Sequence, residues 1–352
     1  MVEKEPSSSA VPNRVLGLDS IRFFCALWVL MSHRARPPFT EGFDPSSPLA
    51  QKVNGLAWML VSGPAAVIVF FIISGFCIHF PQRNLDQFNI GKFLARRYFR
   101  LVPPMLGAIV FSWVIKADLH DLSNTVLWSL FCELIYYSIY PLLFFAAKRI
   151  GWRNLFYISF VAALGVALTK PISTTVNYSA YGLMGNWIIG LPCWLLGVLL
   201  AQKFSQRPAM PGEISIWLWR SSAIGLGWVA NTLALQQIIG HPFTLNFVAI
   251  FAFFWLQREI AWYTTHKPIK FFEWAGEWSY SIYLVHVLAF HMLNQAKIPM
   301  FGYVMNWLIK ITFALLVSYI FYRIIEKPSH WLARRLVGRP QLVPHQKLQT
   351  VS

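Results

Sequence analysis

The chain has 352 residues, of which 56% are hydrophobic and only 12% are charged. Because a soluble domain carries about a quarter charged residues, this composition excludes an ordinary water-soluble fold. The formal net charge of +16 would suit a nucleic-acid partner, but the basic residues gather in polar segments between apolar runs, as the positive-inside rule describes. Composition and charge therefore favour an integral membrane protein that binds no nucleic acid.

Apolar stretches long enough to cross a bilayer recur along the whole chain. They predict an all-α fold, namely a polytopic transmembrane helical bundle with about ten spans. The predicted spans are 17–33, 59–80, 101–117, 124–147, 154–170, 184–202, 214–237, 243–258, 276–295 and 303–325. Because their number is even, both termini are expected in the cytoplasm. The segment 34–58, rich in proline and polar residues, is then the largest early outside loop.

The runs follow one another without a long polar linker, so a single membrane domain is predicted over residues 15–338. Residues 1–14 form a polar N-terminal tail, and residues 339–352 form a C-terminal tail. The four cysteines lie inside apolar runs on different predicted helices, with no disulfide or metal-binding spacing. No metal site is therefore expected.

Ionisable side chains inside a bilayer are costly, so the few present are candidates for function. Arg22 and His33 are eleven positions apart in the first span, which is about three turns and about 16 Å of rise, so both lie on one helix face. Asp19 precedes Arg22 by one turn and can pair with it. An isolated histidine at a membrane edge more often has no function and only extends its side chain into the water at the interface. The shared face with an arginine instead favours a general base that takes the proton from an acceptor hydroxyl.

The fourth predicted span contains Glu133, with Tyr137 one turn further on. A carboxylate in the middle of a span needs a partner. It can be neutralised by a tyrosine or by an arginine from another helix, which would hold the bundle together. Alternatively, it can orient a catalytic histidine or bind acceptor hydroxyls. The sequence leaves these two interpretations open.

Two further segments carry polar groups into the bilayer. Arg97 and Arg100 lie in the cytoplasmic segment that leads into the third span. They either obey the positive-inside rule or hold the phosphates of a cytoplasmic donor with their forked guanidinium groups. In the ninth span, Ser279, Tyr283 and His286 occur together. For Tyr283 and His286, a hydrogen bond between helices is the expected role.

In this order, the motifs resemble the acyltransferase-3 family of bacterial-type membrane O-acyltransferases, over nearly the whole chain. Segment 17–22 followed by His33 is similar to the family's first-span pattern, an arginine and a histidine with ten residues between them. Segment 69–76 is similar to its second-span signature, and segment 279–286 is similar to a late span. The paired arginines of segment 97–100 and the span with Glu133 and Tyr137 also match. Leu134 departs from the pattern, because many members carry a second acidic residue there.

The resemblance implies an acyltransferase, most often an O-acetyltransferase, in the bacterial cytoplasmic (inner) membrane. The donor would be acyl-CoA, usually acetyl-CoA, with no permanently bound cofactor, and the acceptor would be a hydroxyl of a carbohydrate or lipid-linked glycan. The resemblance also implies a functional set of Arg22, His33, Arg97, Arg100 and Glu133. His33 would be the base or a transient acyl carrier, and Ser279, Tyr283, His286 and Tyr137 would line the pocket.

A glycan transporter or flippase without acyl chemistry would also carry arginine, glutamate and histidine inside its spans. The chain shows no internal repeat of the kind that marks many transporters. A catalytically silent assembly subunit is a third interpretation, which the intact set of candidate residues disfavours.

Overall fold

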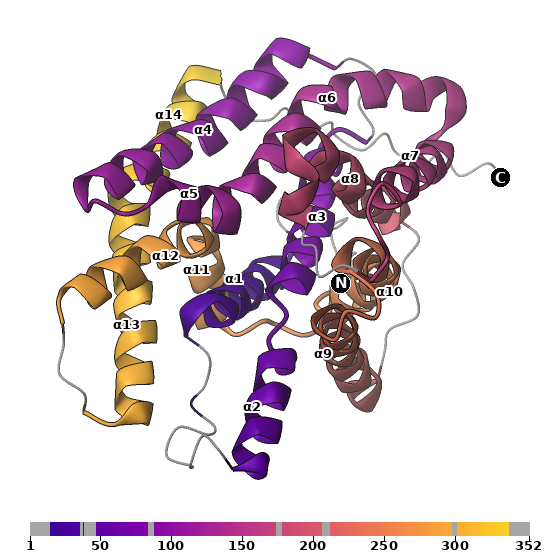
Figure 1. Cartoon of the computed structure of the whole chain (residues 1–352). Helices are drawn as coiled ribbons and strands as arrows, with labels where there is room; N and C mark the ends of the chain where they lie inside the picture. The colour runs from indigo at the N-terminus through magenta and orange to yellow at the C-terminus, as the bar shows by residue number, and fades with distance from the viewer. Residues whose placement is uncertain are drawn as a thin grey trace, which may run out of the picture.

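A computed structural model of the chain describes residues 15–35, 38, 47–83, 88–173, 178–205, 212–297 and 301–337. The predicted tails, 1–14 and 339–352, lie outside these residues. Within them the protein is helical and contains no β-strand, so the all-α prediction is confirmed. Figure 1 shows the helices gathered into one bundle.

The longer helices are α1 (Leu18–Arg34), α2 (Pro48–Leu60), α3 (Gly63–His79), α4 (Ile90–Val114), α6 (Trp128–Ile150), α7 (Trp152–Ala167), α8 (Gly182–Gln202), α9 (Glu213–Leu235), α10 (His241–Trp262), α12 (Ser279–Gln295) and α13 (Tyr303–Phe321). Shorter helices are α5 (Leu119–Leu122), α11 (Lys270–Gly276) and α14 (Lys327–Val337). Two π-helical turns, η1 (Ser123–Leu127) and η4 (Tyr322–Glu326), and two 3₁₀ turns, η2 (Tyr178–Tyr181) and η3 (Lys203–Ser205), complete the described elements.

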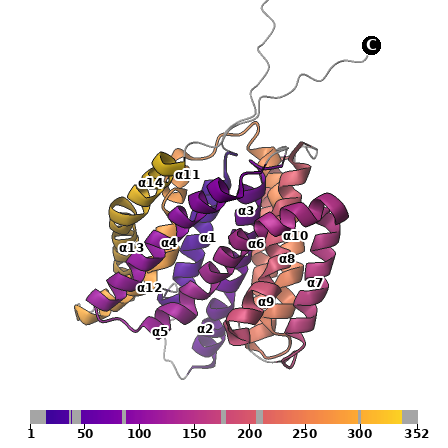
Figure 2. The same cartoon turned by 90° about the horizontal axis from the view of Figure 1, so that it is seen from above.

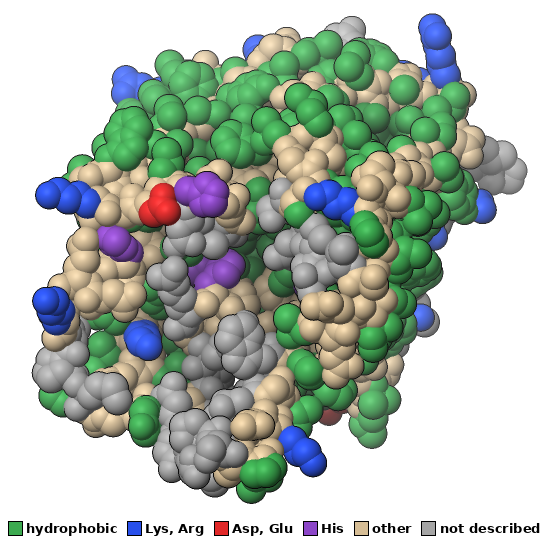
Figure 3. Space-filling view, viewed as in Figure 1, with side chains coloured by type: hydrophobic (Ala, Val, Ile, Leu, Met, Phe, Trp, Pro, Cys, Tyr) green, Lys and Arg blue, Asp and Glu red, His purple; other side chains and the backbone are tan. Residues whose placement is uncertain are grey.

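Every predicted span overlaps one of the long helices. Four helical stretches are both long and apolar enough to cross a membrane, namely Trp128–Ile150, Gly182–Gln202, His241–Trp262 and Tyr303–Val337. Gly63–His79 and Trp152–Ala167 are shorter apolar helices. Large apolar side chains such as Leu142, Val161 and Phe247 are more than 60% exposed, and hydrophobic side chains cover much of the face seen in Figure 3. The protein is therefore suited to a lipid environment, while the count of ten spans and the cytoplasmic termini stay predictions.

The segment expected as an outside loop differs from expectation, because it contains α2. Leu49, Val53, Leu56 and Leu60 recur at intervals of four and three residues, which is helical spacing. The helix lies against α9, where Asn231 donates a hydrogen bond to the backbone carbonyl of Met59 at 3.0 Å. The proline and the polar residues of the segment concealed this pattern.

The centre of the bundle is the contact between α3 and α8. Most of α8 is buried, and a glycine on each helix allows close approach: a Cβ on Gly197 of α8 would collide with the backbone carbonyl of Ile72, and one on Gly75 of α3 with that of Trp194. Small residues at crossings are the usual means by which membrane helices pack backbone to backbone. The α3–α8 pair therefore forms a rigid wall beside which the functional groups lie.

The two ends of the bundle differ. α11 and α14 lie at one end and α2 and α5 at the other, as Figure 2 shows. We call the first the arginine-rich end, because α4 begins there with Arg96, Arg97 and Arg100 in its early turns. The other is called the opposite end. In the topology predicted from sequence, the arginine-rich end faces the cytoplasm.

Candidate active site

A cavity of about 320 Å³ opens between α1, α3, α4, α6 and α12. Its wall contains seven of the nine candidate residues: Arg22, Arg97, Arg100, Glu133, Tyr137, Ser279 and Tyr283. These residues come from four helices that are far apart in the sequence, so the fold brings them to one place. His33 and His286 are not in its wall.

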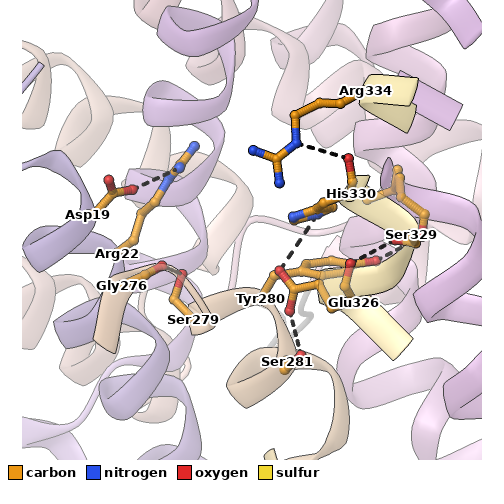
Figure 4. Close-up of polar contacts among 11 residues, drawn as sticks. Asp19, Arg22, Gly276, Ser279, Tyr280, Ser281, Glu326, Ser329, His330 and Arg334 are labelled. Atoms are coloured by element: carbon orange, nitrogen blue, oxygen red, sulfur yellow. Dashed lines mark hydrogen bonds and ion pairs between the residues drawn. The ribbon is translucent and has the colours of Figure 1, made fainter. Parts of the chain in front are cut away.

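On α1, Arg22 points into the cavity and is held by two contacts. Its guanidinium lies 3.3 Å from the carboxylate of Asp19, one turn earlier, which confirms the predicted pair and is drawn in Figure 4. It also donates to the sulfur of Cys77 on α3 at 3.4 Å. The positive charge of Arg22 is thereby fixed at the wall of the cavity, with 23% of its side chain exposed.

The other two cavity arginines lie at the start of α4. This helix is capped by Asn89, whose side chain accepts a hydrogen bond from the backbone N–H of Lys92 at 2.9 Å. Arg97 lies further along, above the ring of Phe93, and its buried Nε has no hydrogen-bond partner among the described residues. Because buried donors are nearly always paired, this nitrogen is suited to an oxygen of a ligand.

Glu133 on α6 is held by hydroxyl groups. It accepts a hydrogen bond from Ser74 on α3 at 2.5 Å and another from Tyr137. The indole of Trp194 donates in turn to Ser74 at 3.3 Å. The expected tyrosine partner is confirmed, and no arginine is bonded to Glu133 among the described residues. A role in orienting a histidine or binding acceptor hydroxyls stays a prediction.

We expect Glu133→Gln to lower activity about tenfold while the protein remains folded, because a neutral amide keeps the shape and weakens the charge-assisted hydrogen bonds. The control is Glu259→Gln, outside the cavity, which breaks a buried pair with Arg220 at 2.7 Å and should instead reduce stability by about 3 kcal/mol. Thermal unfolding in detergent and acyl-transfer rates separate the two effects. A fully active Glu133→Gln protein would limit Glu133 to packing.

Glu326 is a cavity residue that the sequence analysis did not assign. It is 1% exposed, ends the π-helical turn η4, accepts a hydrogen bond from Ser281 at 2.5 Å and lies 3.8 Å from a ring nitrogen of His330. Figure 4 draws Glu326 and His330 together with Arg22, and all three residues line the cavity. The available signal was an acidic residue at the end of a long apolar run, since such residues are candidates by default. Ser74, Cys77 and Ser129 were also missed.

The cavity ends at a pair of hydroxyl groups. The hydroxyl of Tyr283 on α12 and that of Ser129 on α6 are 2.6 Å apart, and both residues are buried. The ring of Phe70 packs edge-on against Tyr283. The predicted hydrogen bond between helices is thus confirmed for Tyr283, and it closes the cavity on the side of His286.

His33 and His286 form a second pair, just beyond that closed end. His33 Nδ1 lies 2.7 Å from His286 Nε2, and the rings are stacked with centroids 5.0 Å apart. His286 is one turn from Tyr283 along α12. The sequence predicted a pocket that includes His33, whereas the cavity wall contains Tyr283 and neither histidine.

The contacts of His286 determine which nitrogen of His33 can accept a proton. His286 Nδ1 lies 2.8 Å from the carbonyl of Tyr283 and 3.0 Å from that of Ile282, and carbonyls only accept, so this nitrogen carries the hydrogen. Neutral His286 then accepts at Nε2, and His33 donates from Nδ1. Neutral His33 is left with its lone pair on Nε2, the nitrogen that acts as a base.

A second cavity of about 410 Å³ lies at the opposite end, lined by Asp118, His120, Asn124 and His291 among others. Histidine and acidic side chains gather over α5 in Figure 3. His291 belongs to α12, two turns beyond Tyr283. The two cavities therefore lie at successive levels along α12, separated by the Tyr283–Ser129 pair.

Comparison with known proteins identifies the family. The model of the family's acyltransferase domain matches residues 15–323. Acyltransferase MdmB of Streptomyces mycarofaciens is 24% identical over 94% of this chain and 95% of its own. Nodulation protein 10 of Rhizobium leguminosarum bv. viciae is 23% identical over 95% of this chain and 98% of its own. No solved structure matches the chain.

A third relative is longer than this chain. O-acetyltransferase OatA of Staphylococcus aureus (strain NCTC 8325 / PS 47) is 24% identical over 90% of this chain, which corresponds to 57% of OatA. The family match covers most of the present chain and all of the residues that line the cavity except Glu326 and His330. The chain therefore belongs to the acyltransferase-3 family and is an acyltransferase.

Proposed function

We propose that the protein is a membrane O-acyltransferase that moves an acyl group from cytoplasmic acyl-CoA to a hydroxyl of a carbohydrate or glycan acceptor. The observation that carries the proposal is the arrangement of one cavity: three arginines line it, and its closed end lies one helical turn from a histidine pair. The names of OatA and MdmB, an O-acetyltransferase and an acyltransferase, agree with this chemistry.

The donor suits the cavity in charge and in size. Arg97 and Arg100 can hold phosphate oxygens at the mouth, since the arginine fork matches phosphate geometry. A volume of about 320 Å³ lies at the lower limit of ligand pockets, so the pantetheine arm and the acyl group would enter while the nucleotide stays near the arginine-rich end. Arg22, held beside Cys77 in the same wall, would support the donor with a further positive charge.

His33 would act on the acceptor. His33 belongs to the last turn of α1, toward the opposite end of the bundle. We therefore propose that the acceptor hydroxyl reaches Nε2 of His33 from that end. The base removes the hydroxyl proton as the oxygen attacks the acyl carbonyl, the C–S bond breaks, and the thiolate of CoA takes up a proton. The products are an ester and free CoA. If His33 is instead a transient acyl carrier, the acyl group passes through the same nitrogen.

The Tyr283–Ser129 pair imposes one condition on this reaction. Donor and acceptor approach it from opposite sides, because the cavity ends there and His33 lies beyond. The acyl carbonyl and the hydroxyl must therefore meet at this level, with the pair parted during transfer.

Purified protein in lipid nanodiscs provides the direct test. Given radiolabelled acetyl-CoA, it should release free CoA and pass label to a glycan fraction from the producing cell, and His33→Ala protein should do neither. Movement of an unmodified glycan across vesicles, with no acyl transfer from any acyl-CoA, would contradict the proposal and support a transporter. A mass increase on surface glycans that disappears when the gene is deleted would identify the acceptor.

We expect His286→Ala to reduce kcat about ten- to a hundredfold, the usual effect of removing a group that orients an active side chain. The KM for acyl-CoA should change little, because His286 lies outside the donor cavity. His286→Gln retains a side-chain acceptor and should recover part of the rate. If KM alone rises, or if glutamine restores nothing while the protein is folded, the tautomer argument is wrong.

A further inference from the structure

The cavity between α1, α3, α4, α6 and α12 changes character along its length. Its wall at the arginine-rich end includes Arg97, Arg100 and His330. Along α3 the lining residues extend from Ile78 to Val67, eleven positions or about 16 Å of helix rise. The cavity is therefore a slot that runs roughly parallel to α3, charged at one end.

The other end of the slot is apolar and closed. Val67 on α3 and Leu130 on α6 line it and are 5% and 4% exposed. Phe71, 3% exposed, lies beside them, and the Tyr283–Ser129 pair completes this end. Val67, Phe71 and Leu130 belong to the packed core of the bundle, so this apolar part of the end wall has little freedom to retreat from a longer ligand.

This inference rests on the function proposed above. The phosphates of an acyl-CoA can be matched only at the charged end, so the acyl group of an extended donor points to the closed end. We propose that Val67 and Leu130 set the length of the acyl chain that is transferred, and that they restrict the enzyme to a short acyl group such as acetyl. The transfer reaction itself is unchanged.

The expected selectivity follows from the chemistry of apolar pockets. One methylene in such a pocket changes discrimination by about 10- to 200-fold in kcat/KM. Shortening Leu130 or Val67 to alanine removes side-chain carbons from the end wall and leaves space for a longer chain. The ratio of butyryl-CoA to acetyl-CoA activity is therefore the informative quantity, because a general loss of activity cancels in it.

The experiment measures kcat/KM for acetyl-, propionyl- and butyryl-CoA with full-length protein in nanodiscs. In Leu130→Ala and Val67→Ala, the butyryl-to-acetyl ratio should rise at least about tenfold over the wild type. The variant Val67→Leu narrows the slot, and its propionyl-to-acetyl ratio should fall below that of the wild type. Because Val67→Ala and Val67→Leu change the core only slightly, they keep the test available if Leu130→Ala does not fold.

The chain offers matched controls. Val69 is also on α3 and 8% exposed, and Leu127 ends η1, directly before α6, and is 3% exposed, but neither lines the slot. Val69→Ala and Leu127→Ala remove the same atoms from the core, so their ratios should stay within about twofold of the wild type, well below the effect of one methylene in a pocket. Equal changes in the controls would assign the effect to general loosening and overturn the inference.

Two other results would overturn it, and they differ in meaning. If acetyl transfer occurs but the ratios of folded Val67 and Leu130 variants match the wild type, or the wild type uses butyryl-CoA as well as acetyl-CoA, these residues do not set chain length and the proposed function stands. If the wild type transfers no acyl group from any CoA thioester, the proposed donor is wrong and the inference is lost with it.

Discussion

Replacing His33 with alanine is expected to reduce acyl transfer about 10²- to 10⁴-fold, the usual contribution of a positioned general base. The reason is the Nδ1 contact with His286 at 2.7 Å, which leaves the lone pair of neutral His33 on Nε2. The loss should fall on kcat, with donor KM almost unchanged, because His33 is outside the donor cavity. The measurement is initial rates of CoA release and of acceptor labelling across a range of acetyl-CoA concentrations.

The matched control is His266→Ala. His266 lies after α10, stacks on Trp262 and lines neither cavity, so its replacement should leave transfer unchanged. Added imidazole should restore part of the rate of the His33 variant if the missing group is a base. Wild-type acylation by folded His33→Ala protein would remove the catalytic role and leave the histidine pair as a link between α1 and α12.

Much of the site could be predicted from the sequence, because the spacing of residues along a helix fixes the height of each side chain along the helix axis. The ion pair of Asp19 with Arg22 needs only one helical turn, and the structure confirms it at 3.3 Å. Each predicted span likewise overlaps a long helix, because long apolar runs give a strong signal. The family was also identified correctly.

The spacing of residues within one helix does not predict how that helix is rotated relative to its neighbours. Arg22 and His33 lie on one face of α1, yet only Arg22 lines the cavity, while His33 contacts His286 of α12. No pattern within α1 could reveal a ring contributed by a segment some 250 residues away. Glu326 was missed for a related reason, since the π-helical turn that ends at this residue changes the register of the helix face.

The arrangement explains why costly groups are kept inside the bundle. Glu133 is satisfied by Ser74 and Tyr137, and Glu326 by Ser281, so each carboxylate has hydroxyl donors and no arginine bonded to it among the described residues. Among the described residues no carboxylate pairs with Arg97 or Arg100, so these two cavity arginines remain available for an anionic ligand. If these groups served only packing, direct arginine–glutamate pairs such as that of Arg220 with Glu259 would be the expected arrangement.

Arg97→Ala is expected to raise the KM and Kd for acyl-CoA about ten- to a hundredfold, because each hydrogen bond to a charged group contributes about 1.5–3 kcal/mol. The structural reason is that Arg97 lines the cavity and its buried Nε has no partner within the described part of the chain. With saturating donor, kcat should change less, since the histidine pair is untouched. Equilibrium binding of CoA and steady-state kinetics in nanodiscs measure the two effects separately.

Arg96, the residue before Arg97, provides a matched control. Arg96 has the same charge, lies on the same turn of α4 and also has a buried Nε without a described partner, but it does not line the cavity. Arg96→Ala removes one positive charge from the same membrane end, so any effect on topology or surface potential is shared by both variants. A selective rise in KM for Arg97→Ala alone can only come from the cavity. If both variants bind the donor as tightly as the wild type does, these arginines serve only membrane topology, and the donor phosphates bind elsewhere.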